Sequence, residues 1–229
     1  MARMGKRISK AYENLDNIEF LTLPEAIKTI KSRASAKFDE TIEIAMNLNV
    51  DVRRADQTVR GMVQLPHGTG KNLRVAVFAK DEKAKEALAA GADYAGSDEL
   101  TNMIQKGEIN FDRCIATPDM MIVVGKLGKI LGPKGLMPNP KLGTVTVNVA
   151  EAVKAAKGGQ IEYRAEKAGI VHGGVGKVSF AEDKLQDNIK MFINTVMKAR
   201  PAGIKGNYLK KISLSSTMGP SIKVDISEF

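Results

Sequence analysis

The first part of the chain has the pattern of a helix followed by half-buried strands. Apolar residues recur every three or four positions over residues 24–34, which predicts a helix with one buried face. Apolar and polar residues then alternate over 42–48, as in a strand with one face in the core. Residues 59–65 predict a second strand, which Pro66 ends.

The pattern changes between residues 67 and 159. Residues 73–79 (LRVAVFA) are almost all apolar, which is typical of a strand buried on both faces. Predicted helices follow, a further strand is predicted over 113–117, and the links between these elements are short. Strands that alternate with helices in this way favour a small parallel α/β sheet over residues 67–159.

After two successive glycines, Gly158 and Gly159, the alternating pattern returns. An amphipathic helix is predicted over residues 182–199. Two alternating segments after it, 207–217 and 221–226, are expected to pair across a Met-Gly-Pro turn. Short strands separated by glycine turns are predicted over residues 160–164, 170–174 and 177–180.

The first and last parts of the chain therefore share an antiparallel α+β pattern, and they bracket the α/β segment. The economical interpretation is one discontinuous domain, residues 1–66 and 160–229, with residues 67–159 inserted as a second domain. The predicted fold class combines an α+β domain with an α/β domain. The glycines at the second junction and the Gly-rich segment after Pro66 supply flexible joints between the two.

The charge of the chain favours an anionic partner. Its 35 Lys and Arg residues exceed its 26 Asp and Glu residues, which gives a net charge of +9. Residues 120–150 contain no acidic residue and include GKLGKILGPKGLMPNP (125–140), which predicts a helix end running into an exposed cationic loop. Residues 188–224 are also free of acid and carry seven basic residues. A nucleic acid fits this distribution, and a merely soluble basic protein is the alternative.

The residues that enzymes use are scarce. The only histidines are His67 and His172, and the single cysteine, Cys114, excludes a disulfide or a Cys-based zinc site within the chain. The segment HGTGKN (67–72) resembles a phosphate-binding loop but has Leu65 where the first Gly belongs and Asn72 where Ser or Thr belongs. We therefore expect no cofactor and no metal. A phosphate- or nucleotide-handling enzyme on the central α/β domain is the alternative that these failures disfavour.

No membrane segment is expected from the sequence. No apolar run approaches 18 residues, and the N-terminal MARMGKRISK lacks the apolar centre of a signal peptide. The sequence predicts a soluble cytosolic protein with no membrane partner.

Two short motifs have the groups that contact RNA. Residues 215–220 (SSTMGP) place three hydroxyls and a Gly at a predicted strand end, where they can approach ribose and phosphate closely. Residues 37–41 (KFDET) offer a cation, a ring, carboxylates and a hydroxyl at a strand start. The alternatives are an ordinary turn and a strand entry with Phe38 in the core. Because aromatics are only 5% of the residues, double-helical RNA suits the chain better than stacked single strands.

Six segments together resemble a known family. AKFDETIE, VRG-x-V-x-LPHGTGK, GADY-x-G, ATPDMM, GKLGKILGPKGLMPNP and STMGPS match, in order along the chain, the motifs of the L-one family, the first protein of the bacterial large ribosomal subunit. The resemblance implies a discontinuous split β-α-β RNA-binding domain with an inserted Rossmann-like domain. It also implies a protein without catalytic activity, cytoplasmic, on the large subunit and monomeric off the ribosome.

The resemblance further implies specific partners and contact residues. The family binds a stem-junction of large-subunit rRNA, forms a mobile stalk beside the tRNA exit site, assists release of deacylated tRNA, and represses translation of its own operon by binding the mRNA. The residues implied to contact rRNA and mRNA are Lys37, Phe38, Glu40, Thr41, Lys167, His172, Ser215, Thr217, Met218 and Gly219. In the inserted domain, the residues implied to face the outgoing tRNA are Lys126, Lys129, Lys134 and Lys141.

Overall fold

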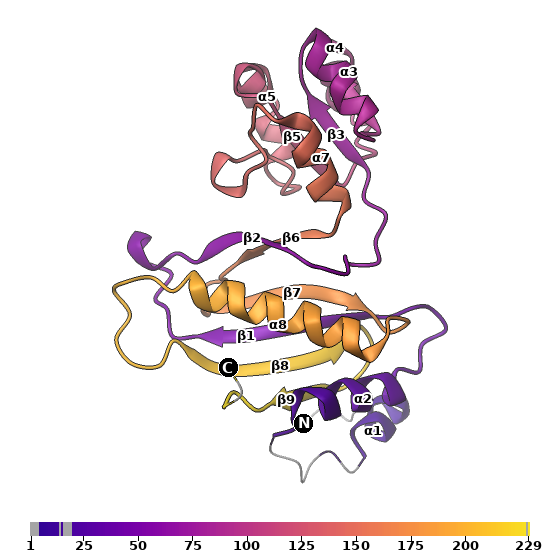
Figure 1. Cartoon of the computed structure of the whole chain (residues 1–229), viewed down its shortest axis with the longest axis vertical. Helices are drawn as coiled ribbons and strands as arrows, with labels where there is room; N and C mark the ends of the chain where they lie inside the picture. Colours follow the sequence, from indigo (N-terminus) through magenta and orange to yellow (C-terminus); the bar gives the residue numbers. More distant parts are fainter. Residues whose placement is uncertain (1–4, 14, 16–19, 228) are drawn as a thin grey trace. The chain divides into compact units, whose positions relative to one another are not determined.

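The chain divides into two compact units. The computed structural model describes residues 5–13, 15, 20–227 and 229 (Figure 1). Unit 1 comprises Met1–Gly70 and Ile161–Phe229, and unit 2 comprises Lys71–Gln160. The boundaries predicted from the sequence lie after residue 66 and before residue 160.

Residues 67–70 belong with unit 1 because a buried side chain holds them there. Asn188 is fully buried; its Oδ1 accepts from the backbone N–H of His67 at 3.1 Å, and its Nδ2 donates to Gly68 O at 3.0 Å. Asn188 Nδ2 also donates to Val175 O at 2.8 Å. A buried amide with satisfied partners fixes the geometry of the backbone it contacts.

Unit 1 is built on a four-stranded antiparallel sheet in the order β7-β1-β8-β9. Its helices α2 and α8 pack against each other and against the sheet (Figure 1). The strands are β1 (Thr41–Leu48), β7 (Ile170–Lys177), β8 (Leu209–Ser216) and β9 (Ser221–Val224), and the helices are α2 (Leu23–Arg33) and α8 (Glu182–Lys198).

The alternation read from the sequence decides which face of this sheet is buried. Ile42, Ile44 and Met46 of β1 are at most 1% exposed and pack with the apolar sides of both helices, whereas Glu43 between them is exposed. The antiparallel pairing of β8 with β9 confirms the predicted hairpin. Unit 1 also contains the short helix α1 (Lys6–Tyr12), the one-turn helix η1 (Ala55–Gln57) and the paired strands β2 (Arg60–Gln64) and β6 (Gln160–Arg164).

One prediction for unit 1 is wrong. Residues 170–180 were expected to form two short strands separated by a glycine turn, but β7 is continuous from Ile170 to Lys177. The glycines within β7 make room for side chains of the helix that packs on this strand. A Cβ on Gly173 would lie 2.6 Å from the Phe192 ring, and a Cβ on Gly176 would lie 2.7 Å from Leu185 Cδ2. Helix α8 therefore packs closely on β7 because these strand positions lack side chains.

Unit 2 contains the predicted parallel sheet, in the order β4-β3-β5. The central strand β3 is buried on both faces: Ala76 and Phe78 belong to one apolar cluster, Val75 and Val77 to another. The strands are β3 (Val75–Phe78), β4 (Tyr94–Gly96) and β5 (Arg113–Ala116). The helical segments are α3 (Asp81–Ala89), α4 (Asp98–Gln105), η2 (Pro118–Met120), α5 (Met121–Lys126), α6 (Gly128–Leu131), η3 (Pro140–Leu142) and α7 (Val149–Lys157).

Within the described part of the chain, no helix has the length and apolar character needed to span a membrane.

Candidate nucleic-acid interface

The two motifs that were predicted to contact RNA meet at one end of the unit 1 sheet. The backbone N–H of Thr217, just after β8, donates to Thr41 O at 3.0 Å, and Thr41 N–H donates to Thr217 Oγ1 at 3.0 Å. These residues are 176 positions apart in sequence. We call residues 36–41 together with 215–219 the platform. It brings together eight of the predicted contact residues: Lys37, Phe38, Glu40, Thr41, Ser215, Thr217, Met218 and Gly219.

Glu40 joins the two halves of the platform through hydrogen bonds of its buried carboxylate. Its side chain is 2% exposed, and its carboxylate accepts from the backbone N–H of Ala36 at 3.0 Å and of Met218 at 3.0 Å. Both carboxylate oxygens of Glu40 are thus bonded within the protein, and a direct contact between Glu40 and RNA stays a prediction. Its role in the structure is to position the two loops that carry Phe38 and Met218.

The carboxylate of Glu40 is held in its charged form. Burial by itself raises the pKa of Glu40, but the adjacent Ser216 hydroxyl, the Met218 and Ala36 amides, and the charge of Arg7 outweigh that effect. The pKa of Glu40 consequently lies below its ordinary value. The platform is thus organised around a buried negative charge that its own backbone amides satisfy.

Two large apolar side chains project from the platform into solvent. Phe38 is 55% exposed and Met218 is 45% exposed. The alternative in which Phe38 fills the core is excluded by this exposure. Large apolar groups exposed on a polar surface indicate a binding site, since they gain free energy when a partner covers them.

A lysine that the sequence analysis missed supports the platform. Lys177, at the end of β7, donates to Thr41 Oγ1 at 3.0 Å and to Asp39 O at 3.2 Å. Asp39 in turn accepts from the Ser179 hydroxyl at 2.7 Å. The local sequence gave no signal for Lys177, because its relation to Thr41 follows only from the pairing of β7 with β1.

The face of the unit 1 sheet that is not covered by α2 and α8 carries small and polar side chains, and it adjoins the platform. Strand pairing places Ala45 between His172 and Ser213, and places Ser213 beside Lys223. His172, a predicted contact, is exposed and lies on β7, the edge strand next to β1. Lys223 is one of the seven basic residues already noted in residues 188–224. Ser213 was not singled out, although the alternation of β8 was the signal that could have placed it on this face. Small side chains let a rigid partner approach a sheet closely.

Lys167 lies apart from the platform. It is exposed in the turn between β6 and β7, next to the end of β7 that begins at Ile170, whereas the platform adjoins the other end at Lys177. At about 3.3 Å per residue, β7 separates the two ends by roughly 20 Å. Lys167 and the platform can therefore touch the same RNA only if that RNA runs along the sheet.

The four lysines predicted to face tRNA are all exposed on unit 2. Lys126 ends α5, Lys129 lies in α6, Lys134 lies in the turn after α6, and Lys141 lies in η3. The predicted helix end consists of these two short helices, which are separated at Leu127. The segment remains the acid-free, turn-rich cationic surface that the sequence indicated.

The other candidate reactive groups have structural roles. Cys114 is buried in β5, and burial raises the pKa of its thiol to about 12, so it is not a nucleophile. His67 Nε2 lies 3.0 Å from Asp187 Oδ2, which fastens the segment after β2 to α8.

The platform and the sheet face lie within a recognised family region. The family model described as the Ribosomal protein L1p/L10e family matches residues 30–220, including both halves of the platform and all of unit 2. The chain belongs to this family. As a member of the Ribosomal protein L1p/L10e family it is a cytoplasmic component of the large ribosomal subunit, it binds large-subunit rRNA, and it is a structural protein and not an enzyme. The resemblance seen in the sequence is confirmed.

Proposed function

We propose that unit 1 binds large-subunit rRNA through the platform and the adjoining sheet face, and that the bound chain forms a mobile stalk near the tRNA exit site. The observation that carries this proposal is the platform itself. Two motifs 176 residues apart are joined by reciprocal hydrogen bonds between Thr41 and Thr217, and the joined surface exposes Phe38 and Met218.

The chemistry of the platform suits folded RNA. The wide minor groove of an A-form helix presents 2′-hydroxyls and base edges, which are read by hydroxyls, backbone groups and close apolar contact. Thr217 offers a hydroxyl, Met218 a thioether, and Gly219 a backbone without a side chain. A Cβ on Gly219 would collide with Ser216 Oγ, so a side chain at this position requires the Ser216 hydroxyl to move.

The same surface accounts for the proposed repression of the chain's own operon. An mRNA that presents the fold recognised in rRNA would occupy the platform, and the two RNAs would then exclude each other. We expect large-subunit rRNA to displace the operon mRNA leader from the chain in a competition titration. Simultaneous binding of both RNAs would contradict a shared site.

Unit 2 supplies the proposed contact with outgoing tRNA. Its exposed lysines lie in a segment without acidic residues, so their charge is not offset within that segment. We propose that they assist the release of deacylated tRNA. Lys129→Ala should leave the affinity for an isolated rRNA fragment unchanged and weaken the contact with tRNA on the ribosome.

Removing the exposed apolar side chains of the platform should weaken RNA binding without loss of stability. Phe38→Ala and Met218→Ala are each expected to cost about 1–3 kcal/mol of binding free energy, the range for covering a large apolar side chain. Both residues are about half exposed, so the melting temperature should stay close to that of the wild type. Filter binding with large-subunit rRNA and a thermal melt measure the two effects.

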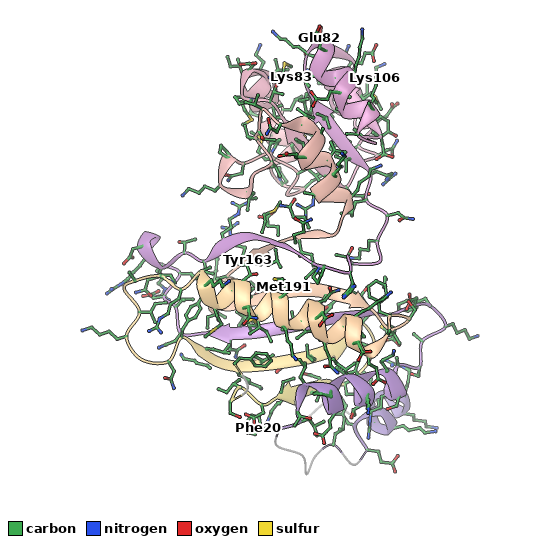
Figure 2. All side chains as sticks on the ribbon, viewed as in Figure 1. Phe20, Glu82, Lys83, Lys106, Tyr163 and Met191 are labelled. Atoms are coloured by element: carbon green, nitrogen blue, oxygen red, sulfur yellow. The ribbon has the colours of Figure 1, made fainter. Side chains whose placement is uncertain are left out.

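Met191 provides a matched control for Met218. It is 44% exposed, against 45% for Met218, and lies on α8 (Figure 2), which packs on the buried face of the sheet. Met191→Ala should leave RNA affinity unchanged. An equal loss for Met191→Ala and Met218→Ala would show that the platform is not the binding surface.

Affinity for rRNA should also fall as salt rises, because cationic side chains that contact phosphates displace condensed counterions. We expect a linear decrease of the logarithm of the association constant with the logarithm of salt concentration. A slope of zero between about 50 and 200 mM salt would contradict electrostatic RNA binding.

A further inference from the structure

The N-terminal helix α1 is attached to the platform through polar contacts. Arg7 Nη1 donates to the backbone carbonyl of Met218 at 2.6 Å, although the two residues are 211 positions apart. Tyr12, at the other end of the helix, accepts through its hydroxyl from the Ser221 backbone N–H at 3.2 Å. Met218 lies in the turn between β8 and β9, and Ser221 is the first residue of β9, so α1 is attached to this turn through both of its ends.

A third contact fixes the end of the helix. Arg33 of α2 donates through Nη1 to the carbonyls of Ala11 and of Glu13, at 2.5 and 2.9 Å. A cation at the carbonyl end of a helix satisfies groups that lack partners within the helix. The position of α1 is therefore set from both ends by side chains of unit 1.

Helix α1 contributes almost nothing to the core. None of its residues is buried, and residues 5–10 are all exposed. Residues 5–12 (GKRISKAY) include Lys6, Arg7 and Lys10 and no acidic residue. Lys6 and Lys10 are four residues apart and so lie on one side of the helix, and Lys10 is also three residues from Arg7. The structure thus fixes a basic, solvent-facing helix beside the turn that carries Met218.

We propose that α1 is a further RNA-binding element, in which Lys6 and Lys10 contact phosphates of the RNA that the platform holds. The proposal rests on the proposed function of the platform. Burial of apolar surface does not explain why the helix is held there, since it buries no residue. Its charge does, because cations fixed beside a binding surface gain affinity for a polyanion at little cost in ordering.

The test compares two pairs of lysines in the same unit. Lys6→Ala/Lys10→Ala removes two charges from α1, and Lys184→Ala/Lys190→Ala removes two exposed charges from α8, on the other side of the sheet. Both variants change the net charge equally, and alanine preserves helix propensity. The association constant for transcribed large-subunit rRNA is measured at several salt concentrations for each full-length variant and for the wild type.

The α1 variant should bind more weakly than the wild type, and the slope of its log–log salt plot should be smaller in magnitude by about 1.8, which is 0.9 for each lost phosphate contact to a duplex. The α8 variant should keep the wild-type slope. Arg7→Ala, which releases the helix from Met218 O, should reduce the slope in the same direction. Circular dichroism establishes that each variant is folded.

Two results would overturn the proposal. One is a wild-type slope in the Lys6→Ala/Lys10→Ala variant. The other is an equal decrease in both double variants, which would mean that only net charge matters. Failure of the proposed function has a different signature, since the wild type itself would then not bind the rRNA specifically and Phe38→Ala would have no effect.

Discussion

A chain in which unit 2 is replaced by a short Gly/Ser bridge is expected to fold and to keep most of its affinity for rRNA. The platform, the sheet and both helices that cover its buried face all belong to unit 1. The strands that flank the insertion, β2 and β6, are hydrogen-bonded neighbours, so the chain leaves and re-enters unit 1 at adjacent strands. Loop closure adds little cost, because each doubling of loop length costs only about 0.6 kcal/mol.

The bridge should start after Gly70 and not directly after β2. Residues 67–70 satisfy the buried side chain of Asn188, and deleting them would leave that amide without two of its partners. The trimmed chain should bind large-subunit rRNA within about tenfold of the full chain, whereas the excised residues 71–160 should bind roughly a thousandfold more weakly, as expected of non-specific binding. Circular dichroism and filter binding on both pieces measure this.

This experiment tests both the location of the RNA-binding site and the independent folding of unit 1. Specific binding of rRNA by the excised unit 2 would place the RNA site outside the platform. A trimmed chain that does not fold would mean that unit 1 depends on unit 2, and the description of the chain as two separable domains would be wrong.

Replacing Glu40 by Ala is expected to damage both stability and RNA binding. The substitution removes the acceptor of the Ala36 and Met218 amides and leaves these N–H groups without a partner. Loss of hydrogen bonds to a buried charged group should lower the free energy of unfolding by about 2–4 kcal/mol. Because the same bonds hold the two halves of the platform together, rRNA affinity should fall at least tenfold, or about 1.4 kcal/mol.

Glu40→Gln isolates the contribution of the charge. The amide retains one oxygen acceptor but directs an NH₂ group toward a backbone N–H, so we expect an intermediate loss of stability. Urea unfolding of the wild type and both variants, followed by filter binding, measures the two effects. Unchanged stability of Glu40→Ala would contradict a platform organised by this carboxylate.

The stability that Glu40 contributes should depend on pH in a defined direction. Its pKa in the folded chain lies below the ordinary value of 4.5, because the surrounding hydroxyl, amides and Arg7 outweigh the effect of burial. A lowered pKa stabilises the fold above the unfolded pKa, and this stabilisation is lost as pH falls through the folded pKa. The difference in unfolding free energy between wild type and Glu40→Gln should be constant above about pH 6 and shrink below 4.5.

This comparison cancels the other carboxylates of the chain. Asp93, Asp112 and Asp225, whose pKa values are also lowered in the folded state, titrate equally in both proteins. Urea unfolding at a series of pH values measures the difference. A difference that stays constant from pH 7 to pH 3.5 would show that the charge of Glu40 does not stabilise the platform.

Local periodicity was sufficient where a residue's environment depends on its near neighbours. The alternation of Ile42, Ile44 and Met46 identified β1 and its buried face, and the apolar run around β3 identified a strand covered on both sides. The period of α8 was also clear, and the helix ends at Lys198, one residue before the predicted end.

The roles of glycines were predicted less well, because they depend on which side chains from other elements pack against the glycine. Gly176 was interpreted as part of a turn between two strands, but it lies in β7 and makes room for Leu185. Helix α1 was not predicted at all. With no buried residue it has no apolar stripe, and the contacts that hold it come from Met218, Ser221 and Arg33.

The sequence by itself determined most of the strands and helices, the parallel sheet of unit 2, the cationic character of its loop and the two motifs that form the platform. These properties depend on residues that are close together in the sequence, so the local pattern of apolar and polar residues is enough to predict them. Only the tertiary structure decided that Thr41 and Thr217 meet, that Glu40 is buried between them, and that Arg7 reaches Met218. Those contacts depend on the strand order β7-β1-β8-β9, which joins residues about 180 to 210 positions apart and which no local pattern encodes.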